Sequence, residues 1–281
     1  MKTLYVTDLD GTLLNQSAKV SEYSTAVINQ LVENGMLFTY ATARSLVSAS
    51  VATKGLSTKI PVIAYNGAFI IKPDTGEVLH SVKFTAEEMK DARELIERNG
   101  ISPLVYSVIY GEERLSWDVG RENAGIRNYL SRRQGDKRLR PLQGSRDLYD
   151  GEVFYFTCVG EREELSPLYD VVRTDQRFVC HFQKELYQPE YFCEIMPAMA
   201  TKAQAIVKLK EIWGCDRIVS FGDAVNDIPM FRISDESYAV ENAVEELKAM
   251  ATGIIASNEQ DGVAKWLLEN EQRLGRMTIS S

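Results

Sequence analysis

Histidine and cysteine are scarce in this sequence. Its 281 residues include only two histidines and four cysteines, and no two cysteines have the C-x-x-C spacing of metal and redox motifs. A structural zinc site needs clustered Cys and His ligands, so the sequence argues against one. The residues concerned are His80, His181, Cys158, Cys180, Cys193 and Cys215. We expect the cysteines to be reduced thiols in or beside apolar segments, and we assign no catalytic role to the histidines.

An excess of positive charge and long apolar runs are also missing. Lys and Arg number 32 against 40 Asp and Glu, which gives a formal charge of -8 and a pI near 5.1. Because affinity for a phosphate backbone needs clustered Lys and Arg, we expect no nucleic-acid partner. No apolar stretch approaches membrane-spanning length, and the N-terminus lacks a charged-then-apolar signal pattern. We therefore expect a cytoplasmic protein without a membrane partner, as a monomer or a weak homodimer.

Strand-like and helix-like segments alternate in the first and last thirds of the chain, without internal repeats or low-complexity segments. This alternation is typical of a parallel sheet with crossover helices. The expected strands are Leu4–Thr7, Met36–Ala41, Pro61–Tyr65, Tyr191–Pro197, Arg217–Phe221, Tyr238–Val240 and Gly253–Ala256. The expected helices are Val20–Asn34, Ala49–Lys54, Lys202–Trp213, Ala243–Met250 and Gly262–Glu269.

The middle of the chain, from about Phe84, has a different texture. The strands expected there are more aromatic and charged: Leu104–Tyr110, Arg114–Val119 and Val153–Val159. Helices are expected at Ala86–Asn99, Glu122–Arg133 and Arg162–Val172, and the basic stretch 132–140 is expected to be a solvated loop. These patterns predict an α/β fold with a Rossmann-like parallel-sheet core domain, residues 1–83 and 190–281, and an inserted α+β cap domain, residues 84–189.

Two carboxylates follow the first expected strand directly. Asp8 and Asp10 come at the carboxyl end of an apolar run, where ligands collect in open α/β sheets. Two clustered acids repel each other unless a cation or a proton lies between them, which favours a divalent metal. An EF-hand calcium loop starting at Asp8 is excluded, because Leu13 occupies the glycine position and Lys19 the position of the bidentate Glu.

Small polar residues also follow three other expected strands. They form the segments Thr42–Arg44, Asn66–Gly67 and Gly222–Asp227. Taken alone, Asp223 and Asp227 could be helix-capping acids, and Lys202 would usually be a surface charge. Since the carboxyl ends of parallel strands meet at one edge of the sheet, we expect these segments to gather near Asp8.

The order of these segments resembles the haloacid dehalogenase superfamily of phosphatases. The four segments that carry the resemblance are Asp8–Leu13, Thr42–Arg44, Lys202 and Gly222–Asp227. The expected insert lies between the second and third of them, and Asn66–Ala68 and Ser257–Ala264 resemble the Cof-type branch with a class IIB cap. The resemblance spans the whole chain.

Phosphoryl transfer needs a nucleophile, a metal and cations around the phosphate. We assign Asp8 as the nucleophile that would form an aspartyl-phosphate, and Asp10 as the general acid for the leaving oxygen and then the base for water. The resemblance implies that the Asp10 carbonyl and the Asp8 and Asp223 carboxylates bind the metal. Mg²⁺ fits better than zinc because these ligands are hard oxygens. Asp227 would be a further ligand or would orient Lys202.

The remaining site residues would contact the substrate. They are Thr42, Ala43, Arg44, Asn66, Lys202 and Asn226. Thr42 and Asn226 would donate hydrogen bonds to phosphate oxygens, and Lys202 would add positive charge. Ala43, Met199 and Ala203 stand where the family usually has glycine; an added methyl group restricts φ but removes no functional group.

The expected activity is therefore Mg²⁺-dependent hydrolysis of a small phosphorylated metabolite, with sugar phosphates suggested by the resemblance. The insert would act as a mobile cap that excludes water. Two alternatives stay open: a phosphomutase of the phosphomannomutase type, and a phosphometabolite sensor without turnover. Residues that could line the cap, or simply pack within it, are Tyr106, Trp117, Arg121 and Tyr129.

Overall fold

A computed structural model describes residues 2–184 and 190–279. The chain divides into two compact units: the first combines residues 1–81 and 201–281, and the second is the continuous segment 82–200. Along the described part of the chain, no helix is both long and apolar enough to cross a membrane.

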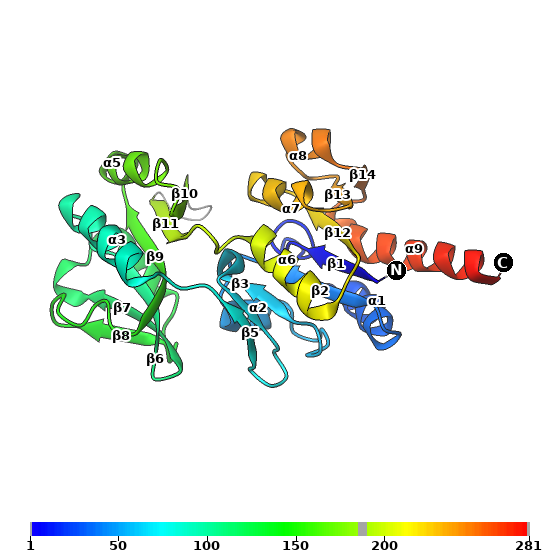
Figure 1. Ribbon diagram of the computed structural model, residues 1–281, viewed down its shortest axis with the longest axis horizontal. Helices are drawn as coiled ribbons and strands as arrows, with labels where there is room; N and C mark the ends of the chain where they lie inside the picture. The colour runs from blue at the N-terminus through cyan, green and yellow to red at the C-terminus, as the bar shows by residue number, and fades with distance from the viewer. Residues whose placement is uncertain (1, 185–189, 280–281) are drawn as a thin grey trace. The chain divides into compact units, whose positions relative to one another are not determined.

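The first unit is built on an eight-stranded sheet in the order β14-β13-β12-β1-β2-β3-β4-β5 (Figure 1). Its strands are β1 (Thr3–Thr7), β2 (Leu37–Ala41), β3 (Val62–Ala64), β4 (Phe69–Ile71), β5 (Val78–Ser81), β12 (Arg217–Gly222), β13 (Glu236–Val240) and β14 (Gly253–Ile255). The strands from β14 to β3 pair in parallel, whereas β4 and β5 add an antiparallel edge. Strand β1 is central and buried from Leu4 onward, as in a sheet covered on both faces.

Helices of the first unit alternate with these parallel strands, and the last helix follows the last strand. They are α1 (Glu22–Glu33), α2 (Leu46–Ala52), α6 (Lys202–Trp213), α7 (Ile228–Arg232), α8 (Glu245–Met250) and α9 (Gly262–Ile279), with short 3₁₀ turns η1 (Tyr65–Gly67), η3 (Val225–Asp227) and η4 (Asn258–Gln260). Hydroxyl side chains cap the first turns of α1, α2 and α6, because Ser21, Ser45 and Thr201 each accept a backbone N–H bond. These caps begin each helix close to a strand end.

The second unit contains a six-stranded sheet in the order β10-β11-β9-β6-β7-β8. Its strands are β6 (Leu104–Ile109), β7 (Glu112–Asp118), β8 (Leu139–Leu142), β9 (Glu152–Gly160), β10 (Phe178–Lys184) and β11 (Tyr191–Pro197). Its helices are α3 (Ala86–Arg98), α4 (Ala124–Ser131), α5 (Arg162–Val172) and the 3₁₀ turn η2 (Val119–Arg121). One core joins α3 and α5 to the sheet through Ile96, Leu168 and Phe156. The predicted α/β fold with an α+β insert is confirmed.

Two details of the insert differ from the sequence-based expectation. Strand β11 pairs with β9 and β10, so it belongs to the insert, and the expected return to the core at residue 190 is corrected to residue 201. The end of the basic stretch expected as a loop, Leu139 and Arg140, belongs to β8, which pairs in parallel with β7. Backbone pairing, rather than an apolar side-chain pattern, makes these residues a strand.

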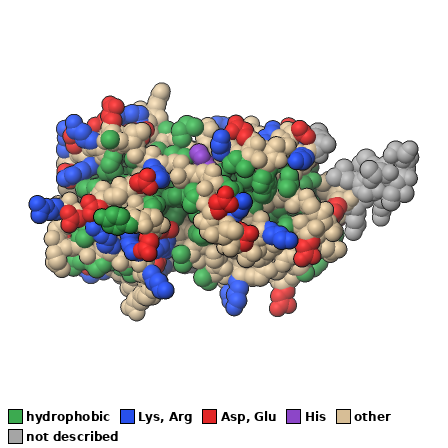
Figure 2. All heavy atoms as spheres, turned by 60° about the horizontal axis from the view of Figure 1, so that its bottom comes forward, with side chains coloured by type: hydrophobic (Ala, Val, Ile, Leu, Met, Phe, Trp, Pro, Cys, Tyr) green, Lys and Arg blue, Asp and Glu red, His purple; other side chains and the backbone are tan. Residues whose placement is uncertain are grey.

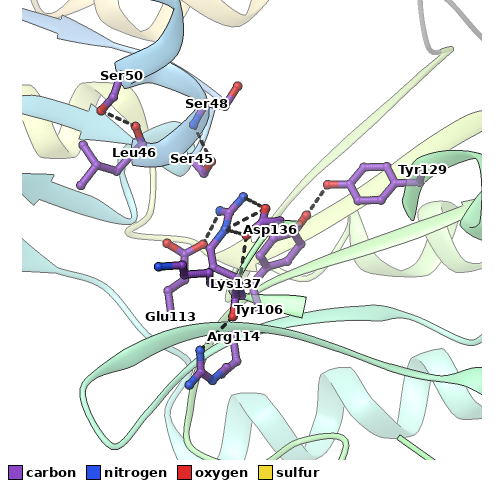
Figure 3. A network of polar contacts seen from close by, with 11 residues as sticks. Ser45, Leu46, Ser48, Ser50, Tyr106, Glu113, Arg114, Tyr129, Asp136 and Lys137 are labelled. Atoms are coloured by element: carbon purple, nitrogen blue, oxygen red, sulfur yellow. Dashed lines mark hydrogen bonds and ion pairs between the residues drawn. The ribbon is translucent and has the colours of Figure 1, made fainter. Parts of the chain in front are cut away.

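Several polar side chains of the insert pair with one another. Figure 3 shows the Tyr106 and Tyr129 hydroxyl groups bonded to each other. Asp136 and Glu113 both accept from Arg138, at 2.6 Å in each ion pair. Figure 2 shows acidic and basic side chains intermingled over the face it draws. The insert therefore pairs its charges within short distances.

Candidate active site

Asp8 lies at the carboxyl end of the central strand β1. Its backbone N–H donates to the Phe221 carbonyl at 3.0 Å, which continues the pairing of β1 with β12 past the last strand residue. The two chains then diverge, β1 into Asp8 and β12 into Asp223. Because these strands are neighbours in the sheet, two acids separated by more than 200 residues of sequence meet at one edge.

Lys202 supplies a buried positive charge to this edge. It is the first residue of α6, and its Nζ donates to Asp8 Oδ1 at 2.5 Å and to Asp227 Oδ1 at 2.9 Å. Its side chain is only 3% exposed. Burial alone would lower the pKa of Lys202, but the Asp227 and Asp8 carboxylates outweigh it and raise that pKa. The ammonium group therefore stays charged between the two acids.

The start of α6 is held in place by a close backbone approach. A Cβ atom on Gly67 would come within 2.2 Å of the Thr201 carbonyl oxygen, and Gly67 has a φ of +110°. Glycine is the residue that tolerates both the contact and the left-handed conformation. The turn after β3 thereby fixes where Lys202 begins its helix.

Asp227 is fully buried and its carboxylate is already engaged. Oδ1 accepts from Lys202, and Oδ2 accepts the backbone N–H groups of Asp223 at 3.0 Å and Ala224 at 3.2 Å. These bonds tie the loop after β12 to Lys202. Asp227 thus orients both the lysine and the segment that carries Asp223.

Asp223 is held against the loop after β1. Thr12 donates its hydroxyl to Asp223 Oδ1 at 2.7 Å. Gly11, with a φ of +82°, lies so near that a Cβ atom there would come 2.4 Å from Asp223 Oδ2. Burial raises the pKa of Asp223 to about 6, and the neighbouring Asp227 carboxylate adds to the rise while the Thr12 bond opposes it. The site therefore carries uncompensated negative charge.

Asp10 and Arg44 form a second, more open pair. Arg44 Nη2 donates to Asp10 Oδ1 at 2.5 Å and Nε to Asp10 Oδ2 at 2.7 Å, while the Asp10 side chain is 55% exposed. The Arg44 backbone N–H donates to the buried Thr42 hydroxyl at 3.1 Å. That bond occupies an acceptor position of Thr42 and leaves its O–H proton for another acceptor.

The other expected substrate contacts lie on neighbouring loops. Asn66 is buried in a left-handed conformation, with φ 55°, and its backbone N–H donates to the Thr42 carbonyl at 2.9 Å. Ala43 and Asn226 are exposed on the loops after β2 and β12. The structure thus links Asp8, Lys202, Asp223 and Asp227 directly, and the Asn66 backbone N–H joins that residue to the loop of Thr42.

Thr12 is a further residue of the site, to which the motif Asp8–Leu13 gave no predicted role. Its hydroxyl is the direct partner of Asp223, and its residue is 1% exposed. The signal was present, because Thr12 follows Asp10-Gly11 within the quoted motif. A hydroxyl four residues after Asp8 fits a structural turn equally well, so its bond to a distant acid was not predictable from spacing.

The carboxylates can hold a divalent cation. Asp8, Asp223 and Asp227 each offer a carboxylate oxygen, and the three oxygens lie within 4.8 Å of one another. Burial raises the pKa of Asp8, and the Asp227 and Asp223 carboxylates raise it further, against the opposing effect of Lys202. One ammonium group thus faces three acids. All donors are hard oxygens, which suits Mg²⁺, Ca²⁺ or Mn²⁺ rather than a soft metal.

Comparison with known proteins agrees with this geometry. Residues 5–267 match the family model of the haloacid dehalogenase-like hydrolases. This chain belongs to that family. The family resemblance expected from the motifs is thereby confirmed, and so is the class of enzyme, a phosphoric monoester hydrolase acting on phosphorylated small molecules.

Two of the three proteins compared below with this haloacid dehalogenase-like hydrolase are named phosphatases. The 5-amino-6-(5-phospho-D-ribitylamino)uracil phosphatase YwtE of Bacillus subtilis is 29% identical over 282 residues, with 92% of this chain and 95% of that protein covered. The crystal structure of TM0651 from Thermotoga maritima is 27% identical, with a TM-score of 0.75 over 96% of this chain and 97% of that one. The subclass IIB sugar phosphatase BT4131 shares the fold, with 20% identity and a TM-score of 0.71 over 96% and 99% of the two chains.

Proposed function

We propose that this chain is a Mg²⁺-dependent phosphatase that hydrolyses a small phosphorylated metabolite through an aspartyl-phosphate on Asp8. The observation that carries the proposal is the Lys202 ammonium group, buried between Asp8 and Asp227. By binding Asp8 Oδ1, Lys202 orients the carboxylate and leaves Oδ2 as the oxygen that can attack phosphorus. A buried lysine at this place also offsets the charge of an arriving phosphate.

The metal would be held by Asp8, Asp223 and the backbone carbonyl of Asp10. We assign Asp227 to orienting Lys202 instead, because its two oxygens already accept three hydrogen bonds. When bound, Mg²⁺ would neutralise phosphate charge and polarise the phosphorus–oxygen bonds. The excess of carboxylates over cations in the cluster supports a divalent ion at this position.

The reaction would proceed in two displacements. Asp8 Oδ2 attacks phosphorus, the bond to the leaving oxygen breaks, and protonated Asp10 gives that oxygen its proton. Asp10 then accepts a proton from water as the water oxygen attacks the aspartyl-phosphate and phosphate is released. Asp10 ends the cycle protonated and Asp8 ends it as a free carboxylate, so atoms and charges balance.

Arg44 would exchange partners during this cycle. In the structure it binds Asp10 through two parallel hydrogen bonds, and a phosphate dianion offers the same fork-shaped acceptor with more charge. The predicted substrate contact of Arg44 is consistent with the Asp10 pair if arriving phosphate competes for the guanidinium group. Thr42, with its free O–H proton, would donate to the same phosphate.

The substrate class we propose is a sugar or sugar-alcohol phosphate. The name of YwtE describes a phosphorylated ribityl compound as its substrate, and BT4131 is named a sugar phosphatase. Residues 82–200 would serve as the cap. We place the enzyme in the cytoplasm, because small phosphorylated metabolites occur there.

Phosphate release tests the proposal. Wild-type protein, Asp8→Asn and the matched control Asp74→Asn, an exposed acid in the β4–β5 turn, are assayed with Mg²⁺ on sugar phosphates, polyol phosphates, nucleotides and phosphorylated ribitylaminouracil. We expect release by the wild type and by Asp74→Asn, but none by Asp8→Asn. Equal release by Asp8→Asn would refute the role of Asp8. Return of an isomerised monophosphate instead of free phosphate would replace the phosphatase with a phosphomutase.

A further inference from the structure

Two asparagines bridge the loops that surround the site. Asn242, in the loop after β13, donates its side-chain amide to the Gly11 carbonyl at 2.8 Å. Its amide oxygen accepts the backbone N–H of Asn258 at 3.1 Å, and the Asn258 amide donates to the Leu14 carbonyl at 2.9 Å. The loops after β13 and β14 are thus tied to the loop that carries Asp10.

The two carbonyls that accept these bonds, those of Gly11 and Leu14, lie in the loop after β1. Gly11 has a φ of +82° and no Cβ atom, so its own backbone restricts the neighbouring peptide planes weakly. On one side of Gly11, Thr12 reaches Asp223; on the other, Asp10 carries the proposed acid. The bond from Asn242 to the Gly11 carbonyl fixes the peptide plane between these two functions.

We propose that Asn242 and Asn258 are positioning residues for the hydrolysis, acting through the Asp10 loop. The inference rests on the proposed function and extends it to two asparagines to which the motifs assign no role. Asn242 would hold the Gly11 carbonyl, and Asn258 would hold both Asn242 and the far end of the loop at Leu14. Asp10 would then approach the leaving oxygen in one orientation only.

The exposure of the bridge separates this role from simple packing. Asn242 is exposed and Asn258 is half-buried, so neither contributes to the hydrophobic core. Removal of their amides should therefore change the temperature of unfolding little. A loss of turnover without a loss of stability is the signature of a positioning role.

The chain offers a matched control. Asn29 on α1 also bridges two segments with its side chain, donating to the Gly55 carbonyl at 2.9 Å and accepting from the Ser57 N–H at 2.7 Å. It has the same chemistry as Asn242 and belongs to the same unit, but its partners lie outside the residues assigned to the site. Asn29→Ala should leave turnover unchanged.

The experiment compares Asn242→Ala, Asn258→Ala, the double variant and Asn29→Ala on two substrates. One is an alkyl phosphate, whose leaving oxygen needs a proton, and the other is p-nitrophenyl phosphate, whose leaving group needs none. We expect each single variant to lose about 10- to 100-fold in kcat/KM on the alkyl phosphate and clearly less in kcat/KM on p-nitrophenyl phosphate. The ratio kcat/KM reports the step in which the leaving oxygen departs, whereas kcat also includes the hydrolysis of the aspartyl-phosphate, in which Asp10 acts as base for both substrates. Because the two residues act as one bridge, the double variant should lose no more than the worse single variant.

Three outcomes would overturn the inference. Wild-type kcat/KM in both single variants would show that the bridge is dispensable. Equal losses of kcat/KM on both substrates, or a fall in unfolding temperature that parallels the loss of kcat/KM, would show a general structural role. An inactive wild type, by contrast, would overturn the proposed function itself and this inference with it.

Discussion

A buried ion-pair cluster in the first unit contrasts with an exposed ion pair in the insert. In the first unit Lys202 is 3% exposed and its partners Asp8 and Asp227 are 8% and 0% exposed. In the insert, Lys83 and Glu152 pair at 2.6 Å with side chains 30% and 58% exposed. Buried charges cost desolvation free energy, whereas exposed pairs cost and contribute little. The first unit therefore keeps a costly buried cluster whose value is chemical. The insert carries exposed pairs beside the partly buried pairs of Arg138 with Asp136 and Glu113, whose side chains are 12% to 25% exposed.

Removing one charge from each unit should give the largest contrast. Lys202→Met leaves the Asp8 and Asp227 carboxylates buried without their cation, so we expect a loss of about 3–5 kcal/mol in unfolding free energy. Lys83→Met breaks only an exposed pair and should cost less than about 1 kcal/mol. Urea denaturation in the presence of a chelator measures both variants. Equal losses would mean that burial does not distinguish the two pairs.

Mg²⁺ should stabilise the first unit and leave the insert unaffected. A cation that binds only the folded state at about 100 times its Kd adds about 2.7 kcal/mol. Titration of the wild type and of Asp223→Asn by thermal unfolding checks this, because Asp223→Asn removes one proposed ligand. If Mg²⁺ raised the unfolding temperature of Asp223→Asn as much as that of the wild type, Asp223 would not be a ligand of the metal.

In the insert, a neutral buried pair should matter more than its ion pairs. Tyr129→Phe removes the hydrogen bond between the Tyr129 and Tyr106 hydroxyl groups, both inside the fold. We expect a loss of about 1–2 kcal/mol, measured by denaturation, with Tyr110→Phe as control because Tyr110 is fully exposed. If Tyr129→Phe had the same unfolding free energy as the wild type, the hydrogen bond between Tyr129 and Tyr106 would not contribute to the stability of the insert.

The smallest expected change in stability concerns the exposed pair of the first unit. Arg44→Gln breaks two hydrogen bonds to Asp10, yet the unfolding free energy should fall by less than about 1 kcal/mol, because Asp10 is solvated. If Arg44 also binds phosphate, the KM for substrate should rise at the same time. A rise in KM with wild-type stability would sharpen the distinction between buried and exposed charges within one site.

The core sheet was predictable because its strands are short apolar runs that end in polar residues. The hairpin of β4 and β5 was not predicted: each strand has three or four residues, and their antiparallel pairing leaves no helix between them as a signal. Strand β8 was missed since it contains Arg140 and Pro141, and its pairing with β7 comes from backbone bonds. Strand β11 was recognised as a strand but not its partners, which no local pattern reveals.

The candidate site shows the same limit. Acids and a lysine in ordered motifs predicted that Asp8, Lys202, Asp223 and Asp227 would meet, and the structure joins them. The bond between Asn242 and Gly11 spans 231 positions and joins a side-chain amide to a carbonyl, which almost any residue offers. Such bonds depend on how loops pack in the folded protein, so the spacing of residues in the sequence does not predict them.

The division of the first unit into two chain segments sets an order of events at the ribosome. The continuous insert, residues 82–200, can close on itself as soon as it has emerged, because its sheet needs nothing that comes later. Strand β1, by contrast, waits for its neighbour β12, and Asp8 waits for Lys202, 194 positions downstream. The nascent chain thus carries Asp8, the proposed nucleophile, before the insert is made, but can complete the site only after Lys202 and β12 have emerged.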